Sequence, residues 1–193
     1  MLNDPDEHGL PRVWREIEMR TVALGFEMPS DMRTGALLKV LAASKPRSRL
    51  LELGTGTGLA TACLLAGMDE DSRLVSVDIN ARYQAIAQEF LGTDTRVSFE
   101  LADGRTFIRG QPGQSFDFIF ADAWAGKYDG VDEALCLVRR GGIFICDDML
   151  PQTSWPDKHE ERVAGLVAHL EGLEGWTTAT LRWGSGFVIA VRR

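Results

Sequence analysis

Short apolar segments alternate with amphipathic segments along the chain from residue 49 onward. Apolar side chains at i, i+3, i+4 and i+7 predict helices over Tyr83 to Phe90, Val131 to Val138 and Val163 to Leu170. Strands that alternate with helices in this way predict a parallel sheet with helices packed on it. The apolar runs predicted to be its buried strands are residues 49–53, 74–78, 97–101, 116–122 and 143–147.

The end of the chain departs from this alternation. Residues 177–183 and 187–191 are strand-like runs that are joined only by Gly184-Ser185-Gly186. A connection this short cannot hold a crossover helix, so it predicts an antiparallel hairpin.

The start of the chain predicts additional helices. A helix over residues 33–44 is expected to end before Pro46, and Gly141 is expected to end the helix that begins near Val131. Residues 1–30 are expected to form a polar tail and a covering helix, with Trp14, Ile17 and Leu24 on one face.

Composition narrows the class of protein. The 193 residues predict one domain, residues 1–193, because 45% of them are apolar and can fill a single core. A net charge of -7 without a cluster of basic residues argues against nucleic acid as a partner. No apolar run approaches the roughly 18 residues that cross a bilayer, and the start lacks a signal-peptide pattern. We therefore expect a cytoplasmic protein with no membrane contact. Its cysteines, Cys63, Cys136 and Cys146, lack C-x-x-C spacing and are expected to pack in the core.

A glycine-rich turn follows the first predicted strand, in the sequence Glu52-Leu53-Gly54-Thr55-Gly56-Thr57-Gly58. Glycine lets the backbone turn tightly and lets a ligand approach the amide N–H groups. Asp78 ends the next strand, where a carboxylate can accept hydrogen bonds from both hydroxyls of a ribose. The combination indicates a nucleoside-containing ligand; the alternative is that the glycines only form an ordinary β–α turn.

The spacing of the glycines separates the ligand classes. A dinucleotide fingerprint needs G-x-G-x-x-G, but the third glycine comes one residue early and Leu59 stands in its place, which disfavours an NAD(P)-binding oxidoreductase. No Gly-Lys-Ser/Thr follows, so a P-loop is excluded. The acidic residue two places before the first glycine resembles motif I of class I S-adenosylmethionine-dependent methyltransferases. That resemblance implies a Rossmann-like α/β fold, with a doubly wound, seven-stranded, mostly parallel sheet that ends in an antiparallel hairpin.

The same resemblance implies S-adenosylmethionine as the cofactor. It places an acidic residue and a neighbouring amide near the adenine, at Asp103 and Gly104, although Asp103 has the alternative role of capping the following helix. The segment that begins at Met32 is also expected to reach the cofactor. The expected cofactor-binding residues are Met32, Glu52, Gly54, Thr55, Gly56, Gly58, Asp78, Asp103, Gly104 and Asp122.

Carboxylates also end the fourth and fifth predicted strands. Asp122 follows the fourth strand, and Asp147-Asp148 ends the fifth. Ligands bind outside the carboxyl ends of the strands in an open α/β sheet, so these carboxylates are expected at one rim. Three unpaired carboxylates repel one another unless a cation neutralises them, and oxygen ligands suit Mg²⁺, Mn²⁺ or Ca²⁺ rather than zinc. We expect Asp122, Asp147 and Asp148 to bind such an ion; Asp148 has the alternative role of a helix cap.

The rim is similar to that of catechol O-methyltransferase-like enzymes, a family that includes bacterial small-molecule O-methyltransferases. The resemblance runs from about Met32 to Met149. In that family an Asp and an Asp-Asn pair hold a divalent ion, and a lysine three residues after the first Asp is catalytic. Here the pair is Asp147-Asp148, and Ala125 stands at the position of the lysine. Lys127 is the candidate base beside Asp122, the alternative being an exposed loop lysine.

The predicted function is transfer of a methyl group from S-adenosylmethionine to a hydroxyl of a small, phenol-like molecule with help from a divalent metal. Trp124 and Trp155 are candidates for the walls of an aromatic site, or for plain packing. The histidines, His8, His159 and His169, do not lie beside these motifs and are assigned no role. Because the usual lysine is missing, a non-catalytic S-adenosylmethionine-binding protein is the alternative. The resemblance also raises a homodimer as an expectation.

Overall fold

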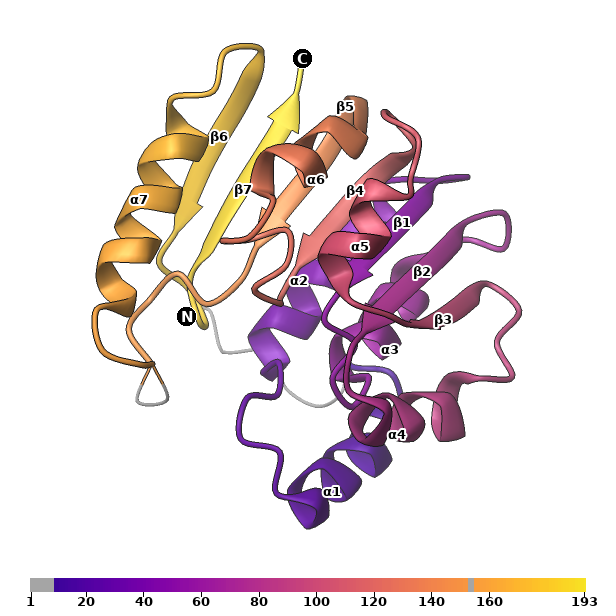
Figure 1. The fold of residues 1–193 in the computed structure, drawn as a ribbon. Coiled ribbons are helices and arrows are strands. Elements are labelled where there is room, and N and C mark those ends of the chain that lie inside the picture. Colours follow the sequence, from indigo (N-terminus) through magenta and orange to yellow (C-terminus); the bar gives the residue numbers. More distant parts are fainter. Residues whose placement is uncertain (1–8, 153–154) are drawn as a thin grey trace, which may run out of the picture.

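The computed structural model describes residues 9–152 and 155–193, and these contain a seven-stranded sheet in the order β3-β2-β1-β4-β5-β7-β6 (Figure 1). The first five strands pair in parallel, while β7 pairs antiparallel with β5 on one side and β6 on the other. The mostly parallel sheet and its antiparallel C-terminal hairpin are thus confirmed. The strands are β1 (Arg49–Leu53), β2 (Arg73–Asp78), β3 (Val97–Leu101), β4 (Phe116–Ala121), β5 (Val138–Cys146), β6 (Trp176–Leu181) and β7 (Phe187–Arg192).

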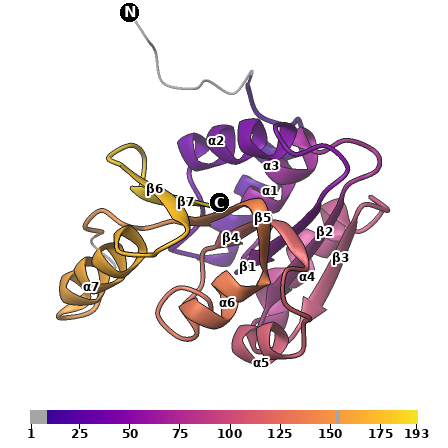
Figure 2. The same cartoon turned by 90° about the horizontal axis from the view of Figure 1, so that it is seen from above.

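Helices cover both faces of the sheet, and Figure 2 shows α2 and α3 on one side with α6 and α7 on the other. Successive strand residues point to opposite faces, so Leu50 packs in the core under α1 to α4 and Leu51 packs in the core under α5 to α7. The helices are α1 (Trp14–Leu24), α2 (Met32–Ala43), α3 (Leu59–Gly67), α4 (Ala81–Leu91), α5 (Gly104–Arg109), α6 (Val131–Leu137) and α7 (His159–Glu171).

Three expectations from the sequence are corrected here. The helix that begins at Val131 ends at Leu137 and not at Gly141, because Val138 pairs with Phe116 and starts β5. The run predicted as a buried third strand, β3, is an edge strand whose residues are half-buried or exposed, since only β2 pairs with it. Cys63 and Cys146 are buried as expected, but Cys136 is exposed on the outer side of α6.

The N-terminal helix α1 packs against α3 and α4. Its Trp14 and Ile17 are buried, and Leu24 packs at the edge of the same core. Thr21 of α1 lies within hydrogen-bonding distance of Thr57 in the glycine-rich turn, with 2.7 Å between the two hydroxyl oxygens. The covering helix therefore supports the turn directly. The polar tail expected before it falls largely on residues 1–8, which lie outside the described residues.

None of the helices in the described part of the chain is both long enough and apolar enough to cross a membrane.

Candidate active site

One cavity of about 860 Å³ lies over the carboxyl ends of the central strands. The glycine-rich turn lies at one end of it and an aromatic cluster at the other, with acidic side chains between them. Most of the residues singled out in the sequence line this cavity: Gly54, Thr55, Gly56, Asp78, Asp103, Gly104, Asp122, Trp124, Lys127, Asp147, Asp148 and Trp155. Met32, Glu52 and Gly58 are not in its wall.

Two glycines of the turn are required by close packing. Gly54 has φ +104°, and a Cβ there would lie 3.0 Å from the backbone carbonyl of Asp122. Gly58 has φ +97°, and its Cβ would lie 2.7 Å from Cβ of Ala87 on α4. Both positions combine a left-handed backbone with no room for a side chain. Gly58 therefore packs α3 against α4, while Gly54 brings the turn against the end of β4.

A buried polar network holds the turn from behind. The Glu52 side chain is 0% exposed, and its Oε2 accepts hydrogen bonds from Thr61 Oγ1 at 2.6 Å and Ser76 Oγ at 2.5 Å. Its Oε1 is buried without a partner, and burial raises the pKa of Glu52 to about 8. Ser76 in turn hydrogen-bonds Thr55 at 2.6 Å. The raised pKa favours the neutral acid at neutral pH. Glu52 lies beneath the turn and outside the cavity wall, and its expected contact with the cofactor stays a prediction.

The acidic partner of the turn lies where the sequence placed it. Asp78 Oδ2 accepts a hydrogen bond of 2.7 Å from the Gly56 amide, and its Oδ1 accepts one of 2.7 Å from the Asn80 amide. Asp78 thus fixes the turn and also faces the cavity. Asp103 caps α5, because its carboxylate accepts from the Thr106 amide at 2.8 Å, and it lines the cavity as well. The two alternatives for Asp103 are therefore compatible.

The segment before α2 lines the cavity together with the glycine-rich turn. Residues 26–31 line it, whereas Met32, predicted to do so, begins α2 and is partly exposed outside. The Phe26 ring lies 4.5 Å from the Tyr83 ring between centroids, which fixes the segment against α4. Ser30 Oγ donates to Asp122 Oδ2 at 3.3 Å. A contact between Met32 and the cofactor stays a prediction.

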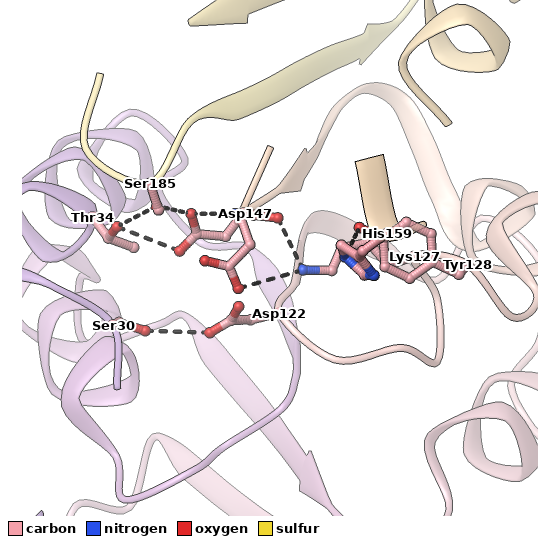
Figure 3. A network of polar contacts seen from close by, with 9 residues as sticks. Ser30, Thr34, Asp122, Lys127, Tyr128, Asp147, His159 and Ser185 are labelled. Carbon is pink, nitrogen blue, oxygen red and sulfur yellow. Dashed lines mark hydrogen bonds and ion pairs between the residues drawn. The ribbon is translucent and has the colours of Figure 1, made fainter. Parts of the chain in front are cut away.

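The rim carboxylates gather as predicted, but each already has partners (Figure 3). Asp147 is only 2% exposed and accepts hydrogen bonds from Ser185 Oγ and, at 3.4 Å, from Thr34 Oγ1. Burial, with the nearby charge of Asp148, raises the pKa of Asp147 to about 7. Burial and the charge of Asp147 also raise the pKa of Asp122 well above its ordinary value.

Lys127 points inward among these carboxylates and is only 4% exposed, so it is not an exposed loop lysine. Its Nζ donates to the Asp147 carbonyl oxygen at 2.9 Å and lies 3.8 Å from Asp148 Oδ2. Burial by itself lowers the pKa of Lys127, but the charges of Asp122 and Asp148 outweigh it and hold the pKa above its ordinary value. A protonated ammonium cannot accept a proton, so this environment opposes the predicted role of Lys127 as the base.

The metal expected from the sequence finds no ready set of ligands in this arrangement. Within residues 9–152 and 155–193, no group of three His, Cys, Asp or Glu side chains is placed to hold a metal ion. Both carboxylate oxygens of Asp147 have hydrogen-bond donors, and the side chain of Asp148 is 40% exposed. Asp148 has φ +61° and lies well before α7, so it does not cap a helix. The donor set does not fit a divalent ion as it stands, and metal assistance stays a prediction.

Four aromatic side chains form the far end of the cavity, and we call them the aromatic cluster: Trp124, Tyr128, Trp155 and His159. Tyr128 Oη lies 3.1 Å from His159 Nε2, and the Trp155 ring centroid lies 4.7 Å from that of His159. Burial and the nearby Lys127 charge lower the pKa of His159, which favours the neutral imidazole. Its Nδ1 is buried without a hydrogen-bond partner. The sequence reasoning gave His159 no role.

Comparisons with solved structures show which class of protein has this fold. The fold matches the structure of an O-methyltransferase from Streptomyces achromogenes with a TM-score of 0.80 and 21% identity, over 94% of this chain and 90% of that one. An O-methyltransferase from Bacillus cereus gives the same TM-score and identity over 98% and 92%. The fold is thus the one that O-methyltransferases use.

The sequence also matches a protein family. The O-methyltransferase family model matches residues 6–171, and the chain therefore belongs to the O-methyltransferase family. A protein of Mycobacterium sp. (strain KMS) named as an O-methyltransferase is 33% identical over 124 residues, which cover 58% of this chain and 53% of that protein. A Dictyostelium discoideum protein named as a caffeoyl-CoA O-methyltransferase is 28% identical over 140 residues, 68% of this chain and 59% of that protein. The chain thus spans about half the length of the curated relatives it matches.

Proposed function

We propose that this chain transfers a methyl group from S-adenosylmethionine to a hydroxyl oxygen of a small, phenol-like molecule. The observation that carries the proposal is that the glycine-rich turn, Asp78, Asp122 and the aromatic cluster all line one cavity. Family membership supports the reaction type. Two structures of the same fold support the choice of S-adenosylmethionine as the methyl donor, because the Streptomyces achromogenes enzyme is described in complex with SAM and the Bacillus cereus enzyme in complex with SAH.

The cofactor end has the donors and acceptors that a nucleoside needs. Asp78 offers carboxylate oxygens for ribose hydroxyls, and the wall at Asp103 and Gly104 suits the adenine. Residues 28–31 close over this end from the N-terminal side. The glycine-rich turn in the cavity wall has neither the G-x-G-x-x-G spacing of a dinucleotide site nor the Gly-Lys-Ser/Thr of a P-loop, which fits a sulfonium nucleoside better than a dinucleotide. S-adenosylmethionine, when bound, supplies the activated methyl group.

The acceptor end suits a flat ring with a polar substituent. Trp124 and Trp155 offer ring faces on which an aromatic acceptor can stack. The Nδ1 atom of His159 at this end is buried without a hydrogen-bond partner, whereas buried polar atoms are usually hydrogen-bonded. We propose that Nδ1 forms a hydrogen bond with a polar group of the acceptor.

Asp122 lies between the two ends and carries the proton in this proposal. As the acceptor oxygen bonds to the methyl carbon, the bond from sulfur to that carbon breaks, and the hydroxyl proton passes to the Asp122 carboxylate. The nearby charge of Lys127 favours the ionised form of Asp122, and the raised pKa makes that carboxylate a better proton acceptor than an exposed aspartate. The remaining contribution of the chain is to align the two reactants.

The proposal is tested by incubating the protein with methyl-labelled S-adenosylmethionine and a panel of phenols, catechols and aliphatic alcohols. Label should appear as a methyl ether on phenolic acceptors. Trp124→Ala should raise KM for the acceptor about tenfold or more, because a stacking face is lost. Trp183→Ala is the matched control, since this tryptophan is partly exposed and lies outside the cavity wall. Binding of S-adenosylhomocysteine without label transfer to any acceptor would instead favour a non-catalytic binding protein.

A further inference from the structure

The loop after β4 directs Lys127 into the protein. Gly126 has φ +81°, and the amides of Lys127 and Tyr128 both donate to the Trp124 carbonyl oxygen, at 3.2 and 2.9 Å. Ala125 and Asp129 bridge the base of this turn. The lysine at its tip therefore points toward the sheet rim, and Figure 3 shows its nitrogen beside the acidic groups.

The ammonium of Lys127 has a defined place among the carboxylates. Its Nζ donates a hydrogen bond to the main-chain carbonyl oxygen of Asp147, at 2.9 Å, and forms an ion pair with Asp148, at 3.8 Å. These partners belong to the two residues expected to bind a metal after β5. A buried charge persists only where opposite charges and hydrogen-bond acceptors surround it, and this site offers both.

The same position is unfavourable for a second cation. A divalent ion needs oxygen ligands at about 2.0 to 2.6 Å. The Asp147 carboxylate instead accepts hydrogen bonds from Ser185, Thr34 and the Asp148 amide, which an ion would have to displace. An ion that approached Asp148 would also approach the positive charge of Lys127, and like charges repel strongly where water is scarce.

We propose that the Lys127 ammonium is the cation of this site and takes the place of a divalent ion beside Asp122, Asp147 and Asp148. The inference rests on the proposed function only for its catalytic consequence, which is that methyl transfer proceeds without added metal. Lys127 is then a positioning residue: it offsets the rim charge and fixes the carboxylates around the acceptor hydroxyl. This role of Lys127 explains two observations together. Ala125 stands where the family has its lysine, and the rim carboxylates do not form a site for a divalent ion.

Direct binding of Mn²⁺ tests the inference independently of any acceptor. Titration followed by electron paramagnetic resonance should show no specific binding to the parent protein and one bound ion in Lys127→Ala, with affinity raised at least about tenfold. Lys127→Arg keeps the charge and should stay without the ion. Lys45→Ala is the matched control, since this half-buried lysine lies outside the cavity wall and should leave Mn²⁺ binding unchanged. One tightly bound Mn²⁺ in the parent protein overturns the inference.

Turnover gives the second measurement. The parent protein should keep its full rate in EDTA, within about twofold, while Lys127→Ala should lose at least about tenfold and regain most of it with Mg²⁺. Mere loss of structure would not be rescued by metal. Activity of the parent protein that vanishes in EDTA and returns with Mg²⁺ contradicts the inference while leaving the proposed function intact. If no acceptor is methylated, the proposed function fails and the Mn²⁺ result still decides the inference. Should Lys127→Ala not fold, the parent protein alone decides it in both measurements.

Discussion

Replacing Glu52 with Gln should remove a large pH dependence of stability. Glu52 is fully buried beneath the glycine-rich turn, and its pKa moves from an ordinary 4.5 to about 8 in the fold. A buried acid with a raised pKa binds its proton more tightly in the folded state than in the unfolded one. Its stabilising effect is therefore complete below pH 4.5 and is lost progressively as the pH rises toward 8.

The size of the effect follows from the two pKa values. Each pH unit between them costs up to about 1.4 kcal/mol, so the free energy of unfolding should fall by roughly 2 to 3 kcal/mol between about pH 5.5 and pH 7.5 through Glu52 alone. Gln keeps the size of the side chain and an acceptor for Thr61 and Ser76, but it cannot ionise. Asp122 and Asp147 also have raised pKa values, so the Glu52 contribution is the difference between parent and variant.

Urea unfolding followed by tryptophan fluorescence at several pH values measures this difference. The free energy of unfolding of the parent should fall more steeply with pH than that of Glu52→Gln, and the gap in slope should close above about pH 8, where Glu52 is ionised in both states. Glu174→Gln, on an exposed side chain, should follow the parent. Equal slopes for the parent and Glu52→Gln would refute a buried, protonated Glu52.

Three further changes test separate parts of the site. Asp78→Ala should weaken binding of S-adenosylhomocysteine by roughly 1 to 3 kcal/mol, measured by calorimetry, because ribose hydroxyls lose an acceptor; unchanged affinity would remove Asp78 from the cofactor site. Gly58→Ala should lower the free energy of unfolding by about 1 to 3 kcal/mol, since its Cβ would lie 2.7 Å from Ala87 on a backbone with φ +97°; an unfolding curve equal to that of the parent would contradict the packing. His159→Phe should raise the acceptor KM with little change in S-adenosylhomocysteine affinity, and Tyr128→Phe should be milder; equal KM values in parent and His159→Phe would place the acceptor elsewhere.

The sequence was most informative where function depends on local pattern. The glycine-rich turn and Asp78 belong to one β–α–β unit, β1-α3-β2, and their contact, 2.7 Å from the Gly56 amide to Asp78 Oδ2, forms within that unit. The alternation of strands and helices likewise predicted the sheet and the place of the rim. Val138 was misassigned because it fits both the helical stripe and the strand, and its pairing with Phe116 decides between them.

The parts that could not be predicted depend on distant or backbone-controlled contacts. Tyr128 and His159 are 31 positions apart in the sequence, and no local sequence pattern around either residue predicts their contact. The inward direction of Lys127 depends on the left-handed Gly126, which sequence spacing alone does not reveal. Ser185 reaches Asp147 only because β7 inserts between β5 and β6, which brings the hairpin loop to the rim.

Calorimetric titration with S-adenosylhomocysteine and with NAD tests most directly that the glycine-rich turn is a methyltransferase cofactor site. We expect one molecule of S-adenosylhomocysteine bound per chain, no heat from NAD, and loss of the binding in Gly56→Val, where a branched side chain would enter the cavity wall. Tight binding of NAD with no response to S-adenosylhomocysteine would contradict it.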